Sequence, residues 1–304
     1  MAYAHEEFLA ETGWLEQHLS DPDVRIVEVT GMLTRTFSNQ AKEACFDLGH
    51  IPGAHFVDMA DPRGPLSDEA SPLPWTWPTP SRVQACMRTL GVSKQTSVVI
   101  YARSPRPGVD FGLMWCTRAW WVMHHHGVTC RVLNGGYEKW LMEGRPVSLA
   151  TSTAPAGGDF PIMGDADQAI ATKEAVLSAI TATEQVCLVD ALSQKSFEGQ
   201  DLVRYGPRKG HIAGAVNVPM TSLVNPETGV FKPAADIRAL FEAAGVSWDK
   251  PVITYCGGAI AATVDAFALR LCGHEMVRVY DGSLAEWTND PRLPMRDPSH
   301  EPGA

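Results

Sequence analysis

The sequence contains an internal repeat, and this repeat limits the folds that the chain can adopt. The first half has the segment Gly-His-Ile-Pro-Gly-Ala at residues 49–54, and the second half has Gly-His-Ile-Ala-Gly-Ala at 210–215. Further pairs of segments match in the same order: 27–29 with 189–191, 90–92 with 244–246, 100–102 with 254–256, and 133–140 with 280–287. A repeat of this length indicates a duplicated domain, because solenoid repeats span only about 20 to 50 residues.

Each copy alternates apolar strands with amphipathic helices. The first copy predicts strands at 25–29, 97–101 and 130–133, with helices at 81–90, capped by Ser81, and at 111–126. The second copy predicts strands at 186–190, 252–255 and 276–280, with helices at 234–244 and 260–271. This alternation is typical of parallel sheets that are covered by helices on both faces. The predicted fold class is therefore α/β, a tandem duplication of one domain, each copy a mainly parallel sheet flanked by helices.

Composition excludes several classes of function. The chain has 304 residues, which is enough for about two domains, and its net charge of −10 argues against general nucleic-acid binding. No apolar run approaches the roughly 18 residues that a membrane helix requires, and no signal peptide is visible. The seven cysteines form no C-x-x-C pair. This pattern is typical of reduced thiols in a cytoplasm and predicts no metal site.

Cys256 is the residue of the second copy with the clearest chemical signal. It lies between the strand at 252–255 and the helix that begins near 260, so we expect it at the carboxyl end of a strand, where α/β sheets bind ligands. The first amides of a helix have no partner within the helix, and the helix dipole adds positive potential there. Such a position can lower the pKa of a thiol from about 8.5 to roughly 3.5–7.5. We therefore interpret Cys256 as a nucleophile rather than as an inert buried cysteine.

The residues after Cys256 are small, so backbone N–H groups can approach a sulfur atom closely. Glycines 257 and 258 carry no side chain that would hold these groups away. We expect the loop to hold a sulfur anion with its amides. The residues of this predicted cradle are Gly257, Gly258, Ala259, Ile260 and Ala261.

Four motifs together resemble the two-domain rhodanese family, the thiosulfate and 3-mercaptopyruvate sulfurtransferases. They are the two Gly-His-Ile segments, Tyr-Cys-Gly-Gly at 255–258, and Tyr-Asp-Gly-Ser-x-x-Glu-Trp at 280–287. In that family only the C-terminal copy keeps the catalytic cysteine, and Ala102 occupies the matching place in the first copy here. The resemblance implies a catalytically silent rhodanese-like domain at 1–149, a linker at 150–165 and a catalytic rhodanese-like domain at 166–304.

The resemblance also implies a reaction. A thiolate attacks the outer sulfur of a small anionic donor, 3-mercaptopyruvate or thiosulfate, and the resulting Cys256 persulfide passes its sulfur to a thiol or cyanide acceptor. No metal or organic cofactor is implied. Arg204 matches the place of a substrate-binding arginine, and Asp190 ends a strand near Cys256, where it would orient an arginine or a loop amide.

The loop departs from both subfamilies, which leaves the donor open. Thiosulfate-type members usually have basic residues after the cysteine, and mercaptopyruvate-type members usually read Cys-Gly-Ser/Thr-Gly-Val. Here Gly258 replaces the hydroxyl residue and Ala259 replaces a glycine. A persulfide-binding or sensing module without turnover is an alternative function. A cysteine phosphatase or arsenate reductase is less favoured, because their loops read His-Cys-x5-Arg and Ala262 stands where that arginine belongs.

Other residues have two readings each. The histidines 50 and 211 recur in both copies, which favours a structural role, and the run at 124–126 suits a helix end. The tryptophans 75 and 77 either form an apolar wall of a cleft or pack within a domain. The basic residues 208 and 209 either attract an anionic substrate or lie in a solvated loop.

Overall fold

The computed structural model describes residues 2–108, 111–153, 157–161, 166–181, 186–201 and 205–300. The chain forms two compact units. The first unit comprises Glu7–Asp165 with Pro226–Phe231, and the second comprises Met1–Glu6, Ala166–Asn225 and Lys232–Ala304. The domain limits 1–149, 150–165 and 166–304 remain a prediction, and part of the predicted linker lies outside the described residues.

The first unit contains a five-stranded sheet in which every pair of neighbouring strands is parallel. The central strand β4, Ser-Val-Val-Ile-Tyr, is rich in β-branched residues and almost completely buried, as expected for a strand covered on both faces. In the order in which they pair, the strands are β1 (Leu9–Ala10), β5 (Cys130–Leu133), β4 (Ser97–Tyr101), β2 (Val24–Glu28) and β3 (Ala54–Phe56).

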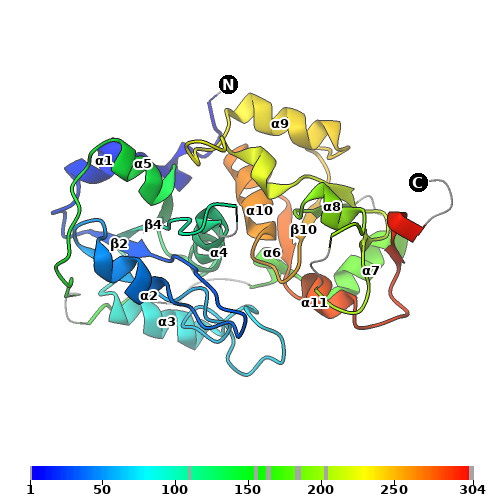
Figure 1. The fold of residues 1–304 in the computed structure, drawn as a ribbon, viewed down its shortest axis with the longest axis horizontal. Helices are drawn as coiled ribbons and strands as arrows, with labels where there is room; N and C mark the ends of the chain where they lie inside the picture. Colours follow the sequence, from blue (N-terminus) through cyan, green and yellow to red (C-terminus); the bar gives the residue numbers. More distant parts are fainter. Residues whose placement is uncertain are drawn as a thin grey trace. The chain divides into compact units, whose positions relative to one another are not determined.

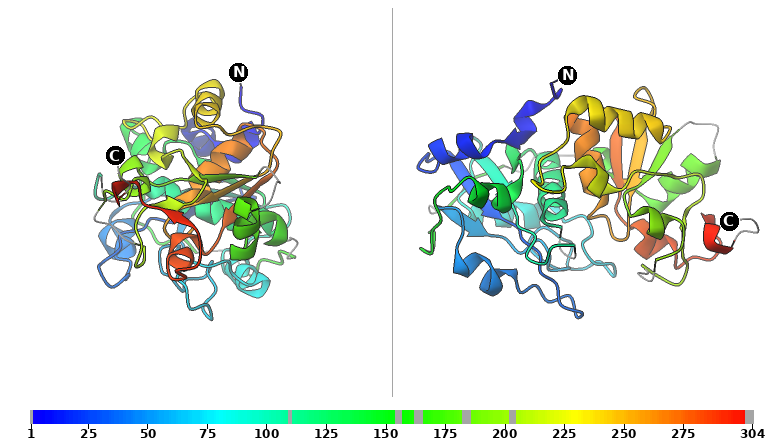
Figure 2. Two further views of the ribbon diagram at one scale, coloured as in Figure 1. Left: turned by 90° about the vertical axis from the view of Figure 1, so that its right-hand side faces the viewer. Right: turned by 45° about the horizontal axis from the view of Figure 1, so that its top comes forward.

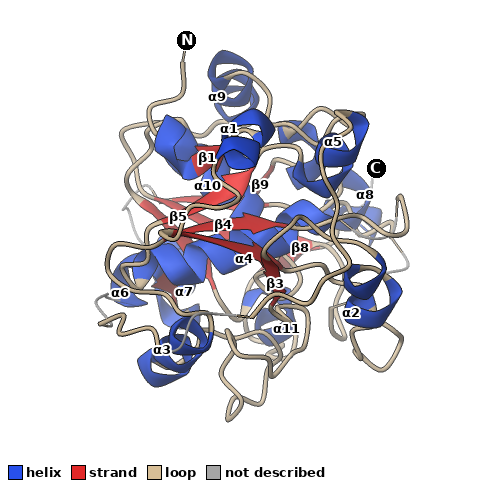
Figure 3. Cartoon of the chain, turned by 90° about the vertical axis from the view of Figure 1, so that its left-hand side faces the viewer, coloured by secondary structure: helices blue, strands red, loops and turns tan. Residues whose placement is uncertain are grey.

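Helices lie on both faces of this sheet (Figures 1 and 3). The side chains of Leu15 in α1 and Trp140 in α5 join one apolar core with the strands, and α4 packs on β4 and β5. The helices of this unit are α1 (Thr12–Gln17), α2 (Ala41–Ala44), α3 (Pro80–Thr89), α4 (Gly112–His125) and α5 (Gly136–Met142), with single 3-10 turns η1 (Glu6–Phe8) and η2 (Phe46–Leu48).

The second unit repeats this architecture with the same strand order. Its five-stranded parallel sheet has β10 at the centre, again buried along its whole length. The strands, in the order in which they pair, are β6 (Ile170–Ala171), β11 (Val277–Tyr280), β10 (Val252–Tyr255), β7 (Cys187–Asp190) and β9 (Val216–Asn217), and a separate antiparallel pair joins β8 (His211–Ile212) to β12 (Met295–Arg296).

Helix α10 packs on β10 and β11 (Figure 2). Val176 of α7 and Trp287 of α11 contribute to an apolar core with the strands. The helices of this unit are α6 (Ala166–Ala169), α7 (Lys173–Thr181), α8 (Gln194–Phe197), α9 (Ala234–Ala243), α10 (Ala262–Leu271) and α11 (Ser283–Trp287), with 3-10 turns η3 (Met220–Leu223) and η4 (Pro298–His300). Among the described residues, no helix has the length and apolar character needed to cross a membrane.

The predicted strands are confirmed to within one residue at either end, and two helix starts are corrected. Helix α3 begins at Pro80 after Thr79, so Ser81 does not cap it. The fixed φ of proline favours the first turn of a helix. Helix α10 begins at Ala262 rather than Ile260, because the N–H groups of Thr263 and Val264 donate to the carbonyls of Ile260 and Ala261, three residues back, as in a 3-10 turn.

The repeated Gly-His-Ile segments have the same structural role in both units. The hydroxyl of Tyr101 accepts the N–H of Ile51 at 3.2 Å, and the hydroxyl of Tyr255 accepts the N–H of Ile212 at 3.1 Å. Each bond ties a Gly-His-Ile segment to the end of the central strand of its sheet. The duplication predicted from the sequence is therefore present in the topology and in individual contacts.

Candidate active site

Cys256 follows the last residue of β10 directly, at the carboxyl end of the central strand. It is 2% exposed. Neighbouring strands β7 and β11 pair with β10 on either side, so the backbone that carries Cys256 is held by the sheet. The predicted position of the cysteine, between a strand end and a helix start, is the one observed.

The sulfur lies in a loop of backbone amides. The N–H groups of Ala262, Gly258 and Ile260 are directed at Cys256, and each lowers the pKa of its thiol. Two of these residues were predicted for the cradle, whereas Ala262, the first residue of α10, was not. Ala259 is a correction, because its N–H donates to the hydroxyl of Ser283 at 3.1 Å instead.

The pKa of Cys256 is displaced in the direction opposite to the sequence-based expectation. Burial raises the pKa of this thiol above its usual range, and the nearby Asp190 raises it further, against the opposing effect of the amides. The reason is that desolvation disfavours a buried anion more than three amides favour it. The loop therefore holds a neutral thiol at rest.

Ser283 holds the cysteine loop in place through three hydrogen bonds of its hydroxyl. Its hydroxyl accepts the N–H of Cys256 at 3.2 Å and that of Ala259 at 3.1 Å, and it donates to the carbonyl of Tyr280 at 2.8 Å. Ser283 has φ of 48°, and the matching residue in the first copy is Gly136, with φ of 59°. The replacement of that glycine by serine was the sequence signal for this role, and sequence reasoning missed it.

Position 257 must be a glycine because a neighbouring side chain occupies the space that a Cβ atom would need. A Cβ atom at this position would collide with the ring of Tyr205, which lies directly against the glycine. Burial raises the pKa of Tyr205, and any negative charge that forms on Cys256 or Asp190 raises it further. Tyr205 therefore belongs to the surroundings of the cysteine, although it has no signal in the sequence.

The two predicted substrate-binding residues have different outcomes. Asp190 ends β7, is completely buried, and accepts the N–H of Leu192 at 2.8 Å, so it orients its own turn rather than an amide of the cysteine loop. Arg204 lies outside the described residues. Its role as a donor-binding residue stays a prediction.

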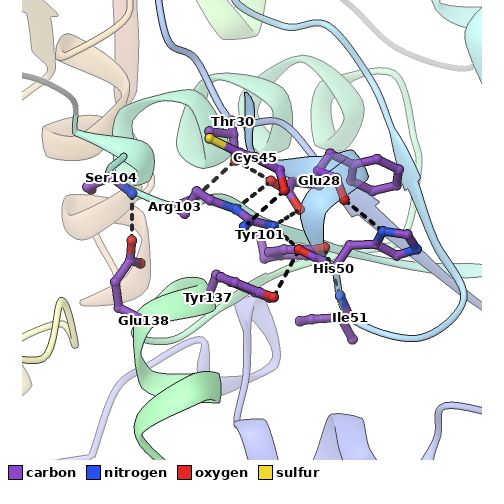
Figure 4. A network of polar contacts seen from close by, with 12 residues as sticks. Glu28, Thr30, Cys45, His50, Ile51, Tyr101, Arg103, Ser104, Tyr137 and Glu138 are labelled. Atoms are coloured by element: carbon purple, nitrogen blue, oxygen red, sulfur yellow. Dashed lines mark hydrogen bonds and ion pairs between the residues drawn. The ribbon is translucent and has the colours of Figure 1, made fainter. Parts of the chain in front are cut away.

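In the first copy, Ala102 stands at the position that matches Cys256, and a polar network takes the place of the cysteine loop (Figure 4). The guanidinium of Arg103 donates to both carboxylate oxygens of the fully buried Glu28, at 2.9 and 2.8 Å. It also donates to the carbonyl of Gly49 at 2.8 Å and stacks on the ring of Tyr137, 3.7 Å from its centroid. This side chain neutralises the acid at the end of β2, in the position that Gly257 occupies after Cys256.

Arg208, His50 and His211 have structural partners in the backbone. Arg208 donates to the carbonyls of Thr288, Leu293, Trp287 and Asp290. The rings of His50 and His211 each donate a hydrogen bond to a backbone carbonyl and stack on a phenylalanine. Within the described part of the chain, no cluster of three or more His, Cys, Asp or Glu side chains suits a metal ion.

The tryptophans at 75 and 77 pack within the first unit. The indole N–H of Trp75 donates to the carbonyl of Ala60 at 3.0 Å, and its ring lies against Trp115. Trp77 stacks on His126. Asp110, which follows the loop of Arg103, lies outside the described residues.

Comparison with known proteins identifies the family. The family model described as "Rhodanese-like domain" matches residues 11–143 and 172–290, one match for each copy of the repeat. "Sulfur carrier protein TtuD" of Thermus thermophilus is 33% identical over 300 residues, covering 95% of this chain and 96% of its own. "Thiosulfate sulfurtransferase" of Bos taurus is 33% identical over 288 residues, covering 92% of this chain and 91% of its own.

A solved structure agrees with these relatives. The crystal structure of SseA from Escherichia coli, described as a 3-mercaptopyruvate sulfotransferase with the rhodanese fold, superposes with a TM-score of 0.77 at 30% identity. The match covers 91% of this chain and 98% of that one. The chain therefore belongs to the rhodanese-like family. It is an enzyme, a sulfurtransferase built from two rhodanese-like domains.

Proposed function

We propose that Cys256 carries the transferred sulfur as a persulfide. Its thiol loses a proton, the sulfur attacks the outer sulfur of a small anionic donor, and the new S–S bond forms as the donor's own bond to that sulfur breaks. The electron pair of the broken bond leaves with the donor residue, sulfite or the enolate of pyruvate. A thiol or cyanide acceptor then attacks the outer sulfur and regenerates Cys256.

The observation that carries this proposal is the set of amides around the sulfur. Three backbone N–H groups, from Ala262, Gly258 and Ile260, are directed at one buried sulfur atom. Preorganised donors stabilise an anion without reorganisation when it forms. The raised pKa of the free thiol agrees with a loop that receives its negative charge only when sulfur is loaded.

We propose 3-mercaptopyruvate as the donor in preference to thiosulfate. Thiosulfate carries two negative charges, and burial of a dianion without cationic partners is costly. The described residues of the cysteine loop, 256–261, include no basic side chain. 3-Mercaptopyruvate has one carboxylate, which a single arginine can hold with two hydrogen bonds, and Arg204 is the candidate.

Replacement of this arginine tests the choice of donor. Arg204→Ala is expected to raise KM for 3-mercaptopyruvate at least tenfold with a smaller effect on kcat, because the arginine binds ground state and transition state alike. Arg292→Ala, a change of an exposed arginine paired with Asp290, is the matched control. A higher kcat/KM for thiosulfate than for 3-mercaptopyruvate would contradict this assignment, as would an unchanged Arg204→Ala enzyme.

A steady-state assay with a sulfur donor and a thiol acceptor distinguishes an enzyme from a sensing module without turnover. Repeated turnover with a thiol acceptor, abolished in Cys256→Ser, supports the enzyme, whereas a single loading event without release supports the module. We place the reaction in the cytoplasm, and the supporting observation is that all seven cysteines are free.

A further inference from the structure

Two buried aspartates of the second unit, one of them beside Cys256, lack the hydrogen-bond partners that buried acids usually have. Asp190 ends β7 and Asp265 lies in the first turn of α10, and both are completely buried. The second carboxylate oxygen of Asp190 and both oxygens of Asp265 have no hydrogen-bond partner among the described residues. A buried acid in this condition is stable only if it is neutral or if an opposite charge arrives.

Among the residues that the structure describes, the titratable side chains that interact with Asp190 are a carboxylic acid, a thiol and a phenol, and none of them carries a positive charge. Asp190 is the register partner of Tyr255, one residue before Cys256. It interacts electrostatically with Cys256, with Tyr205 and with Asp265, and Asp201 also acts on Tyr205. Within the described part of the chain, no arginine or lysine contributes to the pKa of either aspartate.

The first copy treats the equivalent acid in the opposite way. Glu28 ends β2 just as Asp190 ends β7, and there the carboxylate is neutralised by Arg103 at 2.8 Å. The residue that matches Arg103 in the second copy is Gly257. The copy with the cysteine has kept the buried acid, and its described residues place no cation at the position that matches Arg103.

We propose that Asp190 and Asp265 form a proton-holding acid pair behind the cysteine loop. The pair takes up a proton when negative charge appears on the sulfur of Cys256 and releases it when that charge leaves. In sulfur loading, which rests on the function proposed above, the Sγ–H bond breaks, the Sγ–S bond forms, and the proton stays in the site on a carboxylate. The total charge of the buried cluster therefore changes little through the cycle.

The titration behaviour of both acids agrees with this arrangement. Burial raises the pKa of Asp190 to about 7, against the N–H of Leu192, which lowers it. Burial also raises the pKa of Asp265 well above its ordinary range, and Asp190 adds to the rise. Groups that interact in this way titrate together rather than one at a time.

The pH dependence of alkylation of Cys256 by iodoacetamide, followed on its peptide by mass spectrometry, tests the pair in the unaltered protein. The rate is expected to rise about tenfold per pH unit below pH 7 and then to level off, because ionised Asp190 opposes the thiolate. It climbs again at higher pH. A smooth curve for one independent proton would overturn the proposal.

The region in which the rate levels off is the shoulder of the pH profile. Variants show which residues cause this shoulder. Asp190→Asn is expected to abolish the shoulder and to lower the pKa of Cys256 by about one unit, and Asp265→Asn to act in the same direction. Asp236→Asn, which removes an exposed acid on α9, is the matched control and keeps the parent profile. A parent-like profile in Asp190→Asn would overturn the assignment, and if that variant does not fold, Asp265→Asn and the parent curve decide.

Alkylation requires no sulfur donor, so this result is independent of the proposed function. A shoulder without any persulfide on Cys256 supports the acid pair and contradicts sulfur transfer through this residue. A persulfide on Cys256 with a one-proton alkylation curve contradicts the acid pair and leaves the sulfur carrier in place.

Discussion

Ser283 shows how one side chain can define a site that it does not itself chemically enter. Its hydroxyl uses all of its bonding capacity on three backbone groups, two of them within the cysteine loop. The N–H groups of Cys256 and Ala259 therefore point toward Ser283, and those of Gly258, Ile260 and Ala262 point toward the sulfur of Cys256. The division of amides between serine and sulfur sets the shape of the loop.

Removal of this hydroxyl is therefore expected to damage both stability and sulfur loading. Ser283→Ala leaves three buried backbone groups without a partner, at a cost of about 2 kcal/mol or more in the free energy of unfolding. Urea denaturation measures the cost, and persulfide formation on Cys256 measures the loss of loop geometry. Ser247→Ala, which removes a hydroxyl bonded to the exposed Asp249, should change neither. An active, fully stable Ser283→Ala protein would contradict this role.

At the scale of secondary structure, the strand-to-loop transition after the central strand differs between the copies. After β4, the side chain of Arg103 fills the space behind the loop and neutralises Glu28. After β10, the ring of Tyr205 lies against Gly257. No arginine directly follows Cys256 to neutralise Asp190, and burial raises the pKa of this acid. The same topology therefore produces a turn closed by an ion pair in one copy and a loop of backbone amides around Cys256 in the other.

The buried ion pair of the first copy predicts a large difference between two arginine variants. Arg103→Ala leaves Glu28 buried without a partner and is expected to cost about 3–5 kcal/mol in unfolding free energy. Arg292→Ala breaks an ion pair in which the arginine side chain is 87% exposed, and should leave the unfolding free energy almost unchanged. Equal effects of the two changes in urea denaturation would show that Arg103 does not hold Glu28 as described.

Strands were predictable from the sequence because a buried parallel strand is a continuous run of β-branched residues, as in β4 and β10. The position of Cys256 followed from the same runs. The left-handed φ of Ala259 was not predictable, because an alanine does not signal that conformation. Tyr205 reaches the site from a distant part of the chain, so no local pattern could identify it.

At the scale of the whole molecule, each compact unit includes a short segment from the other half of the chain. In the second unit, the N–H of Ala4 donates to the carbonyl of Leu271 at 3.0 Å, and the hydroxyl of Tyr3 donates to that of Lys232 at 2.8 Å. In the first unit, the N–H of Phe231 donates to the side chain of Asn134 at 3.1 Å. A cut in the linker would therefore leave each half without a segment of its own unit.

The stability of the molecule should depend on pH through Asp190. Its pKa is raised from 3.8 to about 7 in the folded chain, so the folded state binds more protons than the unfolded state between these values. Stability from this group is therefore present at low pH and is lost as pH rises from about 4 to 7, by about 4 kcal/mol in total. Asp190→Asn should remove this slope, seen as a gain over the parent at pH 8 that is absent at pH 4. A constant difference between the two proteins across this range would contradict the assignment.

The most direct test of the account is the mass of Cys256 after treatment with a sulfur donor. The peptide that contains this residue should gain one sulfur atom, and a thiol acceptor should remove it. The other six cysteines should stay unmodified, and the Cys256→Ser protein should gain nothing. Sulfur transfer that continues in Cys256→Ser, or a persulfide found on another cysteine, would contradict the central claim.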